Sequence, residues 1–148
     1  MAFAQPSLKG RALKLLASRE HSRAELERKL KTHEQEPGTL KRALDDLQSR
    51  GFIDEDRVAE SLLNRRASKL GAGRIRQELQ AKGLDAERVA LAVAGLKATE
   101  LERAREVWRK KFGVLPADAA GRAKQARFLA TRGFSGEVVR RVLGGDED

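Results

Sequence analysis

The chain has no cysteine and no tyrosine, and only 4% of its 148 residues are aromatic. Without cysteine there is no disulfide, no thiolate metal site and no cysteine nucleophile. The apolar runs are only a few residues long, which argues against a membrane-spanning helix and against a signal peptide. These absences predict a soluble, cytoplasmic protein that makes no contact with a membrane.

Groups that carry out catalysis are also scarce. The two histidines, His21 and His33, lie twelve residues apart, whereas helical zinc ligands usually lie one turn apart, so both are expected at the surface. The acidic run 54–56 opens a predicted helix, where the helix dipole stabilises carboxylates, and capping is the favoured role. No serine stands in a nucleophile elbow. We therefore expect a binding protein that is not an enzyme and has no metal and no cofactor.

Positive charge is what the sequence has in excess. Charged residues make up 36% of the chain, and the formal net charge is +9. No run of residues alternates like a strand, and apolar residues recur at helical spacing throughout. A folded, basic, helical body favours a polyanion or an acidic protein surface as its partner.

The sequence repeats itself with a period near fifty residues. An offset of 50 aligns Leu79 with Leu129 and Gly83 with Gly133, each pair in the same apolar and cap-residue context. Self-similarity at a fixed period is typical of a modular array, in which each unit packs against its neighbours. Further matches at offsets of 49 and 46 join Leu30 to Leu79, and Ala12 to Val58 to Ala104.

The repeats predict an all-α fold, an elongated, solenoid-like array of three tandem three-helix repeats. From the rise of a helix, the array should be roughly 60 Å long. We expect an N-terminal tail at 1–6, repeats at 7–51, 52–97 and 98–143, and a frayed C-terminal tail at 144–148. Helices are expected near 7–18, 22–32, 38–50, 55–70, 73–82, 86–97, 100–112, 117–132 and 136–143.

Residues that begin and end helices support this division. Ser22 with Glu25, and Thr99 with Glu102, have capping-box spacing. Five glycines follow predicted helix ends, where a glycine with positive φ is common. Five aromatic residues at apolar or glycine-flanked repeat positions are expected in the core: Phe52, Phe112, Phe128, Phe134 and Trp108. The five glycines are Gly51, Gly71, Gly83, Gly113 and Gly133.

Basic residues gather in stretches without acids. Between Glu60 and Glu78 there are five cations, and we expect them to converge with backbone amides near the corner at 70–73. Phosphates or a carboxylate-rich protein groove would satisfy such groups. Since few aromatics are left to stack on bases, contacts to nucleic acid should be to phosphates. The candidate site residues are Arg65, Arg66, Lys69, Arg74, Arg76, Arg109, Lys110, Lys111 and Arg127.

Two other functions fit parts of the pattern. Segment 22–50 has two short helices and a turn, as in a helix-turn-helix transcriptional regulator. Its second helix offers Lys41 and Arg42, but Asp45 and Asp46 would repel phosphates. A scaffold that binds only acidic proteins is the third hypothesis.

The middle of the chain resembles a known family. The stretch 51–59, then Arg66, then 71–84 is similar to the signature of the bacterial RecX regulatory proteins, and the flanking thirds are similar to their first and third repeats. This resemblance implies a non-enzymatic, monomeric modulator of the RecA recombinase in DNA repair, recombination and the SOS response. Members bind RecA and its filaments on single-stranded DNA, with duplex DNA as a second candidate ligand. They suppress ATP hydrolysis, strand exchange and co-protease activity, by lying in the filament groove or by blocking filament extension.

Overall fold

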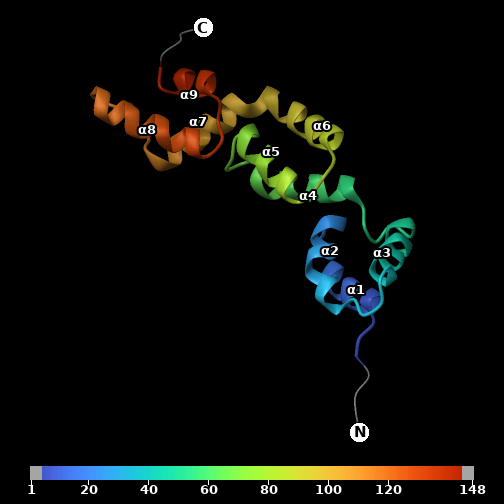
Figure 1. Ribbon diagram of the computed structural model, residues 1–148. Coiled ribbons are helices and arrows are strands. Elements are labelled where there is room, and N and C mark those ends of the chain that lie inside the picture. Colours follow the sequence, from blue (N-terminus) through green and yellow to red (C-terminus); the bar gives the residue numbers. More distant parts are fainter. Residues whose placement is uncertain (1–4, 145–148) are drawn as a thin grey trace.

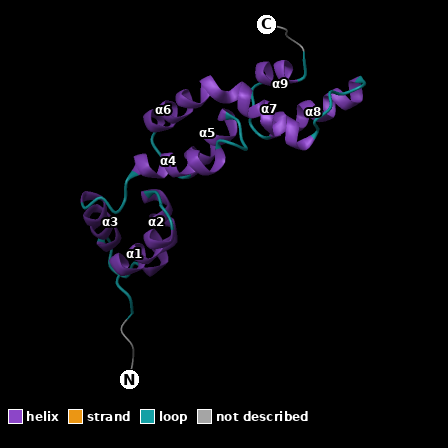
Figure 2. Cartoon of the chain, turned by 180° about the vertical axis from the view of Figure 1, so that it is seen from behind, coloured by secondary structure: helices purple, strands orange, loops and turns teal. Residues whose placement is uncertain are grey.

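The computed structural model describes residues 5–144, and in that range helices joined by loops are present and no strand is (Figure 2). The all-α prediction is therefore confirmed. The elements are α1 (Leu8–Ser18), α2 (Arg23–Leu30), η1 (Lys31–His33), α3 (Thr39–Ser49), α4 (Glu55–Arg66), α5 (Ala72–Ala81), α6 (Ala86–Leu96), η2 (Lys97–Thr99), α7 (Glu100–Lys111), α8 (Ala119–Thr131) and α9 (Gly136–Val142), where η marks a short 3₁₀-helix.

Three separate hydrophobic cores lie along an elongated molecule (Figure 1). The first core draws on residues 12–53, the second on 58–96 and the third on 104–143. Each core is built by three consecutive helices, which we call the first repeat (α1–α3), the second repeat (α4–α6) and the third repeat (α7–α9). The predicted array of three three-helix repeats is confirmed.

Positions aligned by the sequence offsets occupy equivalent places in these cores. Leu79 and Leu129 are both 0% exposed. Ala12, Val58 and Ala104 are likewise buried, one in the first helix of each repeat. Because each repeat encloses its own apolar side chains, its stability is the sum of a local core and the contacts at its junctions with neighbours.

Several local predictions are confirmed and others are wrong. The capping box of Ser22 and Glu25 is present, but Thr99 makes no side-chain cap, because it is the last residue of η2 and its hydroxyl donates to the Leu96 carbonyl. Gly83 and Gly133 have the predicted positive φ, at 79° and 95°, as do Gly51 and Gly113. Gly71 does not: its φ is −80°, and it begins α5 instead of ending α4.

Burial corrects two further predictions. His21 is 1% exposed, not a surface residue, because Nδ1 lies 3.1 Å from the Arg19 carbonyl and Nε2 lies 2.9 Å from Lys29 Nζ. Burial is the main cause that lowers the pKa of His21. Phe52 is 46% exposed, because it follows the Gly51 turn and Ile53 takes the core position.

The ends of two helices also differ from the prediction. Helix α4 ends at Arg66, not near residue 70, and α8 begins at Ala119, capped by Asp118. Of the tail predicted at 144–148, residues 145–148 lie outside the described residues, as do residues 1–4 of the N-terminal tail. No helix in the described part of the chain is long and apolar enough to cross a membrane.

Candidate functional site

The second and third repeats meet through main-chain atoms. The Gly71 amide donates to the Arg132 carbonyl at 2.8 Å, and the Gly73 amide donates to the Gly133 carbonyl at 3.1 Å. A methyl group on Gly71 would overlap the main chain of Gly133. Gly71 is thus required for close approach, since its own φ suits any residue.

Two side chains of α7 complete this junction. Glu100 accepts from the Ala72 amide at 2.7 Å and from the Ser135 amide at 3.4 Å, so one carboxylate serves the starts of α5 and α9. The guanidinium of Arg103 donates to the carbonyls of Ala67 and Leu70 at 2.8 and 2.6 Å. The amides that begin α5 are therefore already paired, and the expectation that they converge on an external anion is wrong.

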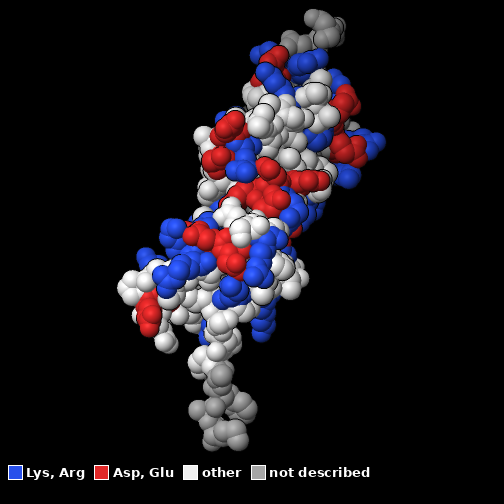
Figure 3. Space-filling model, turned by 90° about the vertical axis from the view of Figure 1, so that its right-hand side faces the viewer, with Lys and Arg blue, Asp and Glu red and all other residues white. Residues whose placement is uncertain are grey.

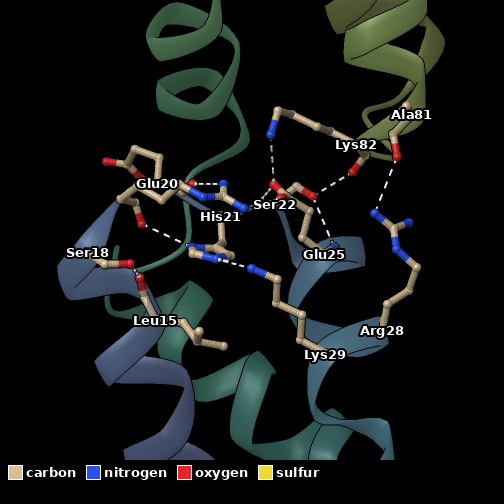
Figure 4. Close-up of polar contacts among 11 residues, drawn as sticks. Leu15, Ser18, Glu20, His21, Ser22, Glu25, Arg28, Lys29, Ala81 and Lys82 are labelled. Atoms are coloured by element: carbon tan, nitrogen blue, oxygen red, sulfur yellow. Dashed lines mark hydrogen bonds and ion pairs between the residues drawn. The ribbon is translucent and has the colours of Figure 1, made fainter.

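The first and second repeats meet through side chains instead (Figure 4). Ser22 Oγ donates to the Lys82 carbonyl at 2.5 Å, and Lys82 Nζ lies 3.2 Å from Glu25 Oε1. Arg19 pairs with the other oxygen of Glu25 at 2.8 Å. Burial by itself would raise the pKa of Glu25, but hydrogen bonds from Arg19 and the Ser22 amide, with the charge of Lys82, lower it to about 2.

A basic pocket opens beside each junction. The pocket of about 410 Å³ at the second junction, which we call the α7–α8 pocket, is lined by Ser68, Lys69, Glu106, Val107, Lys110, Lys111, Phe128 and Arg132. The pocket of about 370 Å³ at the first junction, the α4–α5 pocket, is lined by Arg28, Leu62, Arg65, Arg66, Glu78, Ala81 and Lys82.

The two pockets occupy equivalent positions in successive repeats. Arg65 and Lys111 are related by the offset of 46, and Lys82 and Arg132 by the offset of 50. Both pockets are bounded by the C-terminal ends of the first and second helices of a repeat. The array therefore presents cations at a period of one repeat, a spacing suited to an extended anionic partner.

The predicted site residues divide among several places. Lys69, Lys110 and Lys111 come together in the α7–α8 pocket, and Arg65 and Arg66 in the α4–α5 pocket. Arg127 lies in a separate pocket of about 420 Å³ between α8 and α9. Neither junction pocket includes Arg74, Arg76 or Arg109.

Several cations in the stretches without acids form ion pairs with acidic residues at the edges of those stretches. Arg66 pairs with Glu78 at 3.0 Å across the turn between α4 and α5, and Arg74 pairs with the same carboxylate at 3.4 Å from one turn earlier on α5. The ion pair with Glu78 raises the pKa of Arg66. Arg109 pairs with Glu106 on its own helix. On the face drawn in Figure 3, acidic and basic side chains are interspersed, so the net positive charge does not make that face uniformly basic.

Sequence reasoning missed Phe128 and Arg132 as pocket residues. Phe128 was expected in the core, yet its ring lines the α7–α8 pocket. Arg132 belongs to a basic run of the third repeat, and the signal that could have found it is its match to Lys82 at an offset of 50. Within residues 5–144 no group of three or more His, Asp or Glu side chains is placed to hold a metal ion.

Helix α3 makes a poor reader of duplex DNA. Asp45 lies 2.9 Å from Lys41 and 2.7 Å from Arg23, so the cations of that surface are partly neutralised. Hydrogen bonds from Lys41 and Arg23 lower the pKa of Asp45 and keep it ionised. A recognition helix needs side chains free to contact base edges, and this surface offers few.

Comparison with known proteins identifies the family. Models of the first, second and third three-helix domains of RecX match residues 9–47, 54–93 and 98–143. The Regulatory protein RecX of Leptothrix cholodnii is 58% identical over 139 residues, covering 94% of this chain and 88% of that protein. The Regulatory protein RecX of Herminiimonas arsenicoxydans is 47% identical over 148 residues, covering 100% of this chain and 98% of that protein.

Solved structures share the same architecture. A crystal structure of RecX from Lactobacillus salivarius superposes with a TM-score of 0.77 at 19% identity, covering 92% of both chains. A second crystal structure, of a regulatory protein RecX, gives a TM-score of 0.76 at 22% identity and covers 91% of this chain and 70% of that one. At these identities the structures support the fold, and the curated relatives and domain models support the family. This chain belongs to the RecX family of regulatory proteins.

Proposed function

We propose that this protein regulates the RecA recombinase as a cytoplasmic monomer, by binding RecA and its filaments on single-stranded DNA. It slows ATP hydrolysis, strand exchange and co-protease activity and has no catalytic turnover of its own. The observation that carries the proposal is the pair of basic pockets repeated along an elongated array of a regulatory family. A surface with that period can contact more than one subunit of a helical filament.

The mechanism follows from the shape and charge of the array. A rod that lies across neighbouring RecA subunits resists their relative movement and obstructs the DNA between them. Electrostatic attraction is screened over about 10 Å at ordinary salt, so direct contacts must supply most of the affinity. Lys69 and Lys111 in one pocket, and Arg65 in the other, have exposed side chains that form no ion pair within residues 5–144.

The test is a titration of RecA ATPase on single-stranded DNA with the parent protein and a triple charge reversal. We expect Arg65→Glu, Lys69→Glu and Lys111→Glu together to raise the concentration for half inhibition about tenfold or more, because repulsion replaces contact at both pockets. Arg66 is left unchanged, since it holds Glu78.

The matched control reverses three other exposed cations by the same total charge. Lys31, Lys97 and Lys124 are exposed and line neither junction pocket. If the control variant loses as much inhibition as the pocket variant, net charge rather than the pockets carries the effect. If the pocket variant folds and inhibits like the parent, these pockets are not the contact surface.

A further inference from the structure

The α7–α8 pocket contains an aromatic ring held among cations. Phe128 is fixed by an edge-to-face contact with Phe112, with ring centroids 5.4 Å apart and planes at 86°. Lys111 Nζ lies 5.4 Å from the Phe128 ring centroid, and the Arg132 guanidinium carbon lies 4.8 Å from it. Such cation–π contacts hold two positive charges against the ring that lines the pocket.

The pocket remains positive after its negative groups are counted. Its cations are Lys69, Lys110, Lys111 and Arg132, and its one carboxylate is Glu106, which lies 3.8 Å from Lys110 Nζ. The C-terminal ends of α4, α7 and α8 each add roughly half a negative charge. The four cations and one carboxylate leave a net formal charge of +3, which exceeds the partial negative charge of the three helix ends, so the pocket favours an anion.

The equivalent pocket at the first junction lacks the ring. Glu78 stands there at the position of Phe128, by the offset of 50, and is paired with Arg66 and Arg74. The α4–α5 pocket thus offers cations without an aromatic surface. Only one of these two pockets combines a surface for a base with charges for phosphates, which is the combination that binds single strands.

We propose that the α7–α8 pocket binds one nucleotide of a single-stranded nucleic acid. The base lies against Phe128, and the adjoining phosphates pair with Lys69, Lys110 and Lys111. A base that enters displaces one cation from the ring, and that cation then pairs with a phosphate. An acidic peptide would use the cations but gain nothing from the ring. This inference rests on the DNA-binding part of the proposed function and names its site.

The test compares two labelled oligonucleotides by fluorescence anisotropy, without RecA and at one fixed salt concentration. One is an oligothymidylate, and the other is an abasic strand with the same number of phosphates. A stacked base should give the parent protein about fivefold or more preference for the oligothymidylate. Phe128→Leu should remove that preference, and Phe128→Tyr, which keeps the ring, should retain it.

Two controls separate stacking from charge. The double variant Lys110→Gln and Lys111→Gln should weaken binding of both oligonucleotides while leaving a residual preference for bases. Arg65→Gln, in the α4–α5 pocket, should leave the ratio of the two affinities unchanged. Circular dichroism of each variant establishes that the third repeat is folded.

Three outcomes would overturn the inference. The parent could bind both strands with equal affinity, or a folded Phe128→Leu variant could keep the parent's ratio of affinities for the two strands. Poly-glutamate of matched charge could also displace the labelled oligothymidylate as well as unlabelled oligothymidylate does. The first outcome can be read from the parent alone, so it does not depend on how a variant folds. If the parent inhibits RecA but does not prefer bases, the base subsite is wrong and the proposed function stands. If the parent prefers bases but does not inhibit RecA, the base subsite stands and the proposed regulation of RecA is wrong.

Discussion

The two junctions of the array join equivalent surfaces by different chemistry. Between the first and second repeats, Ser22 and Glu25 reach the turn at Lys82 through side chains. Between the second and third repeats, Gly71 stands at the position of Ser22, by the offset of 49, and its backbone contacts the turn at Arg132 directly. The same geometry is thus achieved once with a capping box and an ion-pair network, and once with close main-chain contact.

The difference shows how the two junctions respond to change. Main-chain hydrogen bonds carry no net charge, so the contact at Gly71 depends on the space around that residue. The buried carboxylate of the second junction, Glu100, is held by two main-chain amides, whereas Glu25 at the first junction is held by two cations and one amide. The first junction depends on a carboxylate that is 7% exposed and on three groups that donate to it. A buried carboxylate that loses its partners is costly, so this junction is sensitive to charge.

Adding one methyl group at the second junction should have the largest effect. We expect Gly71→Ala to lower the free energy of unfolding by about 3–5 kcal/mol, because its methyl group overlaps the Gly133 backbone. Urea unfolding measures the loss by circular dichroism, and Trp108, the single tryptophan, reports on the third repeat.

The matched control for that variant is Gly95→Ala. Gly95 lies within α6 with open space around it, so the same methyl group should stabilise the helix by about 1 kcal/mol. A Gly71→Ala variant as stable as the parent would show that the two backbones are not in close contact.

Removing one charge at the first junction should have the next largest effect. Glu25→Gln keeps the shape but leaves Arg19 and Lys82 without their carboxylate, and we expect a loss of about 2–4 kcal/mol. Glu27→Gln is the control, because Glu27 is exposed and, among residues 5–144, forms its one ion pair with Arg23. Such a surface ion pair contributes about 0–1 kcal/mol. Equal losses in the two variants would mean that the network adds nothing to the junction.

Acid should weaken the first junction by a smaller amount. The pKa of Glu25 is about 2 in the folded protein, so its contribution is complete above its ordinary value of 4.5 and falls as the pH drops toward 2. Burial raises the pKa of Glu55, which accepts from the Arg23 amide. Protonation of Glu55 as the pH falls therefore stabilises the folded protein, the opposite of the effect of Glu25. We expect Glu25 to account for about 1–2 kcal/mol of lost stability by pH 3.

Urea unfolding at pH 7, 5 and 3 measures this dependence. The profile of Glu25→Gln should be flatter than that of the parent, because the titrating group is gone. The profile of Glu55→Gln should be steeper, because it removes the group whose protonation opposes the loss. Parallel profiles for the parent and Glu25→Gln would place the acid sensitivity elsewhere.

The helical array and its period could be predicted from the sequence, because they depend on local patterns. Gly83 and Gly133 end helices with positive φ, a conformation that few other residues adopt. Gly71 follows the same sequence pattern for a different reason, close approach to a backbone 62 residues away, which no local pattern reveals. Its predicted conformation was therefore wrong.

The candidate site was predictable only in part, because charges pair across turns. Lys69, Lys110 and Lys111 were selected as basic residues, and the fold places them in one pocket. The pairing of Arg66 with Glu78 joins residues on two helices and depends on how α4 packs on α5. The contact between His21 and Lys29 likewise depends on the fold, because it joins the segment before α2 to the last turn of that helix.

The direction of capping along the chain bears on how the protein folds as it is synthesised. The start of α2 receives a carboxylate from Glu55, and the start of α5 receives one from Glu100, each supplied by the following repeat. The start of α8 is capped by its own Asp118. On the ribosome, each of the first two repeats would therefore remain incomplete until the first helix of the next repeat has emerged, whereas the second helix of the third repeat is capped within its own repeat.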